Sequence, residues 1–314
     1  MKSIITFAYQ HANPHKSKKS IFNIITGKKS HQTFFDATSL EMLSLYGCAP
    51  TLTYDNFESI IKSTHPHISL PLQNHAPYAI LQQTFTALQL LIQTLSYAKH
   101  GHMSFVPITS QIAVHQTVRR IYHHFHLKTH IQDVEDELYL LFQCLNAKHE
   151  NSTAHYYLTG YDEAMYTTKQ VSLVTQQDMT TLTQIHYTDI VYLYDLLRDN
   201  TQFPILTYCL MHVPLSHTLM RTFVLLNQGR SIHDIAEQTH RTENTIHDHI
   251  LALFIHNYIQ DYTPYLMHNM IDFIQFYNQH PYQKLRFYKE NFEHLSYFEI
   301  KLAIIGIAKG DLHA

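Results

Sequence analysis

Apolar residues recur at helical spacing along most of the chain. One run extends from Ile80 through Leu88 to Leu95, and an earlier one contains Ile21, Ile24 and Ile25. Residues three, four and seven positions apart share one face of an α-helix, whereas strands show strict alternation, which is hard to find in this chain. The pattern therefore predicts an all-α protein.

Glycine and proline mark the expected ends of these helices. Five of the chain's 7 glycines fall at such ends: Gly27, Gly47, Gly101, Gly160 and Gly229. Pro204 and Pro214 bracket a short apolar segment, after which the pattern changes. We expect a helical N-terminal domain over residues 1–212, led by a Lys-rich segment, and a second domain over residues 213–314.

The second domain contains a distinct arrangement of helices. A helix over 216–227 is closed by Gly229, a short helix over 231–238 begins with a capping box of Ser231 and Asp234, and Thr242 caps a third helix. Two helices joined by a tight turn form a helix-turn-helix unit, whose second helix places its first residues in the major groove of DNA. The candidate DNA contacts of this module are Arg230, Arg241, Asn244, Thr245 and His247.

Charge leaves the role of this module open. The chain has a formal net charge of −3, and acidic residues outnumber arginines between residues 217 and 262. Because phosphate contacts supply much of the affinity for DNA, a module of this charge can equally be one that docks protein. His247 and His249 are placed where protonation would offset the acidity.

Positive charge is concentrated in the first 31 residues, where six lysines precede the first acid, Asp36. This segment is interpreted either as a solvated lead-in or as a surface that contacts DNA phosphates. For the second interpretation the candidate residues are Lys16, Lys18, Lys19, Lys28 and Lys29.

Motifs of catalysis and cofactor binding are missing. The stretch from Gly27 to Ser30 resembles the end of a phosphate-binding loop, but the glycine required five positions earlier is Phe22. Histidine pairs occur at ligand-like spacings, including His65 with His67, yet none is joined by a second recognisable pair. We expect no enzymatic activity, no cofactor and no metal site. The 3 scattered cysteines and the absence of a signal peptide or a long apolar stretch predict a cytoplasmic protein without a membrane partner.

Residues about 217 to 309 resemble the helix-turn-helix domain found at the C-terminus of RecQ-type helicases. The resemblance rests on Gly229-Arg230-Ser231 with Ile235-Ala236, on Thr245-Ile246 with His249-Ile250, and on the stretch from Leu295 to Lys301 before a closing helix. Asn257 stands where a glycine would commonly end the third helix, and asparagine tolerates that position.

The preceding part resembles the YpbB-like family of low-GC Gram-positive bacteria, whose gene typically neighbours that of a RecQ-family helicase. Two motifs are similar: the one from Thr26 to Ala37 and the one from Leu158 to Val171. This resemblance implies a non-catalytic, nucleoid-associated adaptor of a RecQ-family helicase in DNA repair or recombination. Its implied partners are the helicase, DNA bound with weak sequence selectivity, and single-strand-binding protein. The alternatives are a transcription regulator and a module that docks protein alone.

Overall fold

The chain is helical throughout the part that the structure describes. The computed structural model describes residues 1–63, 68–102 and 104–314, and within them it contains α-helices and short 3-10 helices (η) but no strand. The predicted all-α class is therefore confirmed. His65 and His67 lie outside the described residues.

The residues group into two compact units that are not consecutive in sequence. The first comprises residues 1–7, 65–71 and 79–211, and the second comprises residues 8–64, 72–78 and 212–314. The expected boundary near residue 212 coincides with one of these divisions. The grouping differs from two consecutive domains, however, because residues 8–64 share the second unit with the helix-turn-helix segment.

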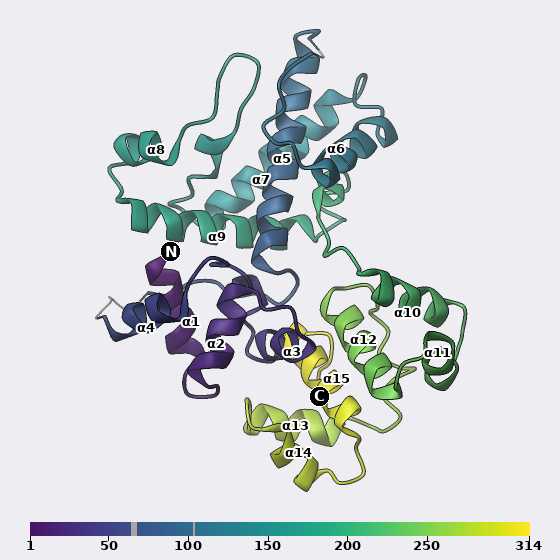
Figure 1. Cartoon of the computed structure of the whole chain (residues 1–314). Helices are drawn as coiled ribbons and strands as arrows, with labels where there is room; N and C mark the ends of the chain where they lie inside the picture. Colours follow the sequence, from purple (N-terminus) through teal and green to yellow (C-terminus); the bar gives the residue numbers. More distant parts are fainter. Residues whose placement is uncertain (64–67, 103) are drawn as a thin grey trace. The chain divides into compact units, whose positions relative to one another are not determined.

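The first unit is built around a long helix, α5 (Tyr78–Lys99), in which twelve residues are buried. Its other elements are α6 (Ile112–His124), α7 (Ile131–Lys148), η2 (Ala154–Tyr157), α8 (Thr168–Thr175), α9 (Met179–Leu197) and η3 (Leu206–Cys209). Helices α7 and α9 pack side by side (Figure 1), and η3 packs on α6. The Glu137 carboxylate accepts hydrogen bonds from the backbone N–H groups of Ile205 and Leu206, which joins α7 to the start of η3.

The second unit joins helices from both ends of the chain. From the N-terminal part it takes α2 (Lys18–Thr26), α3 (His31–Ser39), η1 (Leu43–Leu45) and α4 (Tyr54–Lys62), while α1 (Lys2–Ala12) begins in the first unit. From the C-terminal part it takes α10 (His217–Asn227), α11 (Ile232–Thr239), α12 (Glu243–Ile255), α13 (Ile271–Gln279), α14 (Leu285–Asn291) and α15 (Tyr297–Lys309). Helix α3 packs against α12 and α15, and Figure 1 shows the three together.

A buried asparagine links three segments of this second unit. The Asn74 side-chain amide donates to the carbonyl oxygens of Thr38 at 2.8 Å and Ala308 at 2.9 Å, and its oxygen accepts from the backbone N–H of Leu43 at 3.2 Å. Because a buried amide needs such partners, these bonds fix residues 72–78 against α3 and the end of α15.

Candidate nucleic-acid interface

The helix-turn-helix is formed as the sequence predicts. Ser231 and Asp234 make a complete capping box at the start of α11, and the Thr242 hydroxyl accepts a hydrogen bond from the Thr245 backbone at 3.3 Å. His240 turns the chain between α11 and α12 in the left-handed conformation, with φ of 52°. Asn257 follows α12 with φ of 63°, which is the position where a glycine would be usual.

The first turn of α12 and the segment before α11 are open to solvent. Arg230, Arg241 and Asn244 are exposed, and Thr245 is half-buried with its hydroxyl 3.1 Å from that of Thr242. These positions can reach a ligand without rearrangement of the unit.

The half-buried side chains of His247 and Asp248 both contact α15. The His247 ring stacks on Phe298 with centroids 4.3 Å apart, and Asp248 Oδ1 lies 3.8 Å from Lys301 Nζ. Among the predicted contact residues of α12, His247 is thus engaged by a side chain of another helix.

The surroundings of His247 and His249 disfavour the protonation that would offset the acidity of the module. Burial lowers the pKa of His247, and burial together with nearby His31 and Arg241 lowers the pKa of His249, whose Nδ1 lies 2.7 Å from the Thr222 hydroxyl. The exposed His233 behaves in the opposite way. Its hydrogen bond to Glu243, at 3.0 Å, raises the pKa of His233.

Beyond its first turn, the outward face of α12 is covered. Leu251 lies two turns after Asn244 on the same face, yet it is only 5% exposed. His31, Phe34 and Phe35 of α3 and Lys301 of α15 line the same small cavity as Leu251. A recognition helix contacts base edges mainly through its first residues, and in this arrangement the start of α12 is its accessible part.

The predicted DNA-contacting lysines share the second unit with this module but have different surroundings. Lys18, Lys28 and Lys29 are exposed around α2 and the loop that follows it. Lys16 Nζ lies 2.5 Å from the buried carboxylate of Asp36. Lys19 Nζ lies 4.9 Å from the ring centres of both Phe22 and Tyr54. Three of the five lysines therefore remain fully available to phosphates.

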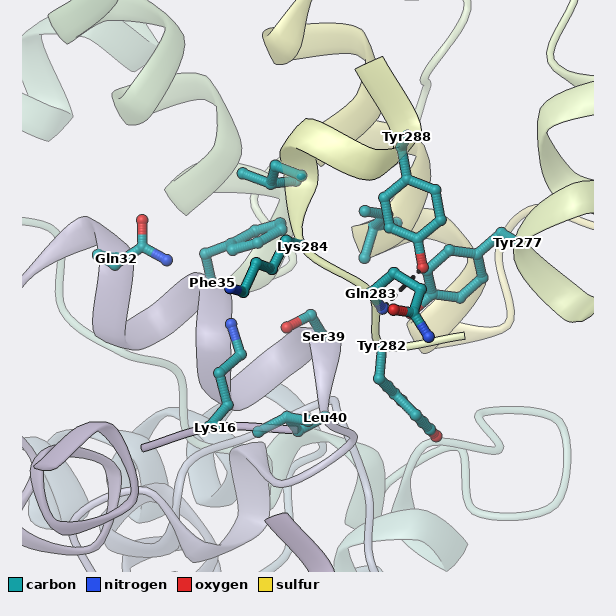
Figure 2. Close-up of a pocket in the computed structure, with 12 residues that line it drawn as sticks. Lys16, Gln32, Phe35, Ser39, Leu40, Tyr277, Tyr282, Gln283, Lys284 and Tyr288 are labelled. Carbon is teal, nitrogen blue, oxygen red and sulfur yellow. Dashed lines mark hydrogen bonds between the residues drawn. The ribbon is translucent and has the colours of Figure 1, made fainter. Parts of the chain in front are cut away.

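A pocket of about 200 Å³ adds a lysine that the sequence did not indicate. Lys16 and Lys284 both line it, and Figure 2 shows their side chains reaching toward the same space, Lys16 from the segment before α2 and Lys284 from the start of α14. Phe35, Tyr277 and Tyr288 contribute its aromatic walls. Lys284 is exposed and far from Lys16 in sequence, so nothing in the linear pattern joins the two.

The part of the chain that the structure describes contains neither a cluster of metal-ligating side chains nor a helix that could span a membrane. No group of three or more His, Cys, Asp or Glu side chains there comes together as a metal ion would require. Within the same residues, every helix falls short of the length and apolar character needed to span a membrane.

The capped helices and the tight turn between them define a helix-turn-helix domain in the C-terminal part of the chain. Residues 218–304 match the family model described as a helix-turn-helix domain. Over nearly its whole length the chain is also similar to Protein YpbB of Bacillus subtilis (strain 168), with 22% identity over 332 aligned positions that cover 93% of each chain. No solved structure matches the chain.

Proposed function

We propose that this protein is a non-catalytic accessory of a RecQ-family DNA helicase that acts in DNA repair or recombination at the nucleoid. The observation that carries the proposal is the closed outward face of α12, where Leu251 is buried under α3 and α15. A module whose recognition helix is covered is better suited to docking a partner or holding DNA without base readout than to reading an operator.

The similarity to YpbB and the match to a helix-turn-helix domain support this role. The sequence motifs that resemble the C-terminal domain of RecQ-type helicases also support it. The accessible docking surface consists of Arg230, Arg241 and Asn244, and the phosphate-contacting surface consists of Lys18, Lys28 and Lys29. Binding to DNA through such lysines depends on salt and discriminates weakly between sequences.

The partner is tested by affinity purification of the full chain from nuclease-treated lysate. We expect a RecQ-family helicase to co-purify, with single-strand-binding protein as a second partner, and the Arg230→Ala/Arg241→Ala/Asn244→Ala variant to lose the helicase. A matched variant, Glu237→Ala/Gln238→Ala, changes exposed residues of α11 and should retain it. Loss of the helicase on nuclease treatment would show an association bridged by DNA and contradict direct docking.

The lysine surface is tested separately with labelled forked and duplex DNA. The Lys18→Gln/Lys28→Gln/Lys29→Gln variant should bind duplex DNA at least about tenfold more weakly at low salt, because three phosphate contacts are lost. Lys16→Gln serves as the comparison, since Asp36 already neutralises that charge. Unchanged duplex binding in the triple variant would remove these lysines from the interface.

A transcription regulator remains the second candidate, and the exposure of Arg241 and Asn244 at the start of α12 favours it. A regulator of this kind binds as a dimer to half-sites about one helical turn apart. Light scattering and selection of binding sites from random duplexes test it. A monomer that selects no sequence would rule out this candidate.

A further inference from the structure

A second basic region lies in the first unit, away from the lysines of the N-terminal segment. No Asp or Glu occurs in the sequence between Glu58 and Asp133. Helix α6 and the turn after it lie within this acid-free stretch, and their basic and histidine side chains are largely exposed: Arg119, Arg120, His123, His124, His126 and Lys128. Two arginines, one lysine and three histidines are thus exposed on α6 and the turn after it, without an acid in the same stretch of sequence.

A groove of about 310 Å³ runs beside this helix. Arg119, His115 and His123 of α6 line it together with the rings of Phe105 and Tyr122, and no acidic residue is among its lining residues. Its volume is at the lower end of the range for small-ligand sites, which is about 300–1,000 Å³. The groove therefore combines cationic and aromatic groups.

Further aromatic rings contact residues of the groove and of α6. Phe105, which lines the groove, packs on Tyr97 with centroids 4.6 Å apart, and the half-exposed Tyr161 lies 5.3 Å from Tyr97. Tyr208 of η3 is 44% exposed and stacks on His124 of α6 at 5.6 Å. Solvation of cationic side chains alone does not explain why aromatic rings are exposed beside them.

We propose that this surface, the α6 face (Arg119, Arg120, His123, His124, Lys128 and Tyr208 with the adjoining groove), binds single-stranded nucleic acid. Cations along a groove follow a phosphate backbone, and exposed rings offer platforms on which unpaired bases stack. In a duplex the bases are already stacked on one another, so these rings favour a single strand. The inference goes beyond the proposed function because it requires no helicase.

Binding of the full chain to a fluorescein-labelled oligothymidylate of about 20 nucleotides tests this inference, with fluorescence anisotropy at several salt concentrations. The Arg119→Gln/Arg120→Gln/Lys128→Gln variant should bind at least about tenfold more weakly, and the slope of log K against log salt should fall by about 2. The matched control is the Lys2→Gln/Lys148→Gln/Lys169→Gln variant, which removes the same charge from exposed positions of the first unit outside the α6 face and should bind the oligonucleotide within about twofold of the parent chain.

Two further measurements distinguish base stacking and nucleic-acid binding from nonspecific attraction between opposite charges. Tyr208→Ala should weaken binding about tenfold, while Tyr208→Phe, which keeps the ring, should bind as the parent does. Equal losses in the two triple variants, or parental binding by the α6 variant, would overturn the inference. Displacement of the oligonucleotide by equimolar polyglutamate would also overturn it, because the α6 face would then be a site for acidic peptides. Failure of the helicase to co-purify would leave every one of these outcomes unaffected.

Discussion

At the scale of single residues, two glycine turns of the second unit pack backbone against backbone. Gly27 ends α2 in the left-handed conformation, with φ of 70°, and a Cβ atom built on it would lie 3.0 Å from the Cα atom of Gly47. Gly229, after α10, has a similar φ of 74° but open space around its Cα. The sequence marks both residues as helix ends, but the close approach at Gly27 is visible only in three dimensions.

We therefore expect Gly27→Ala to destabilise the protein more than Gly229→Ala. Both variants pay the left-handed strain of about 1–2 kcal/mol, and Gly27→Ala must also displace the backbone at Gly47. Urea denaturation at neutral pH should give a difference of at least about 1 kcal/mol between the two variants. Equal losses in the free energy of unfolding for the two variants would mean that the backbone at Gly47 moves without an energetic penalty.

A buried histidine makes the second unit sensitive to acid. Burial, with a contribution from Lys309, lowers the pKa of His256 from 6.5 to about 4, and its ring packs edge-on against Phe34 with centroids 5.0 Å apart. The unfolded state binds a proton at higher pH than the folded state, so folding loses stability as the pH falls from about 6.5 toward about 4.

His256→Phe should remove this part of the acid sensitivity while it keeps a ring beside Phe34. The parent chain should lose roughly 2 kcal/mol more than the variant between pH 7 and pH 5, measured as the difference in the free energy of unfolding. His233→Gln is the control, because His233 is exposed and its pKa is raised by Glu243. Parallel pH profiles for the parent and His256→Phe would assign the acid sensitivity to other groups.

At the scale of elements, the capping residues could be predicted from the sequence because they act locally. Ser231 and Thr242 each cap the helix that follows, and the bonds involved span three residues. The covering of α12 could not be predicted in this way. The covering depends on α3, which is distant in sequence. The periodicity of α12 shows that a face is apolar, but it does not indicate which segment packs on that face. The basic face of α6 was missed for a related reason: its cations are interspersed with apolar residues, so no dense run of charge appears.

Leu251 tests the covering of α12. In an uncovered recognition helix this outward residue would tolerate truncation, but here it is 5% exposed and lines a cavity with Phe34 and Phe35. Leu251→Ala should cost about 2–4 kcal/mol of stability, whereas Asn244→Ala, on the exposed first turn, should change stability by less than about 0.5 kcal/mol. A loss below about 1 kcal/mol for Leu251→Ala would show that α3 does not close this face in solution.

At the scale of the whole molecule, the chain does not divide at one point. A boundary near residue 212 follows from the prolines and the change of pattern, and the compact units do change there. Residues 8–64, however, complete the unit that contains the helix-turn-helix. Asn74 adds a link, because its side chain bonds to α3 and to the end of α15 at once. The C-terminal segment thus depends on the N-terminal one for part of its core.

This dependence predicts the behaviour of a fragment of residues 213–314. Without α3, Leu251 and Ile255 of α12 lose their cover, and the amide of Asn74 is absent from the end of α15. Because apolar burial supplies most of the stability of a small domain, the fragment should unfold at least about 10 °C below the full chain, and its α12 amides should exchange faster with deuterium. Addition of a polypeptide of residues 8–78 should restore their protection. A fragment with full protection on its own would instead make residues 213–314 an independent domain, with α3 a cover that can be removed to expose α12.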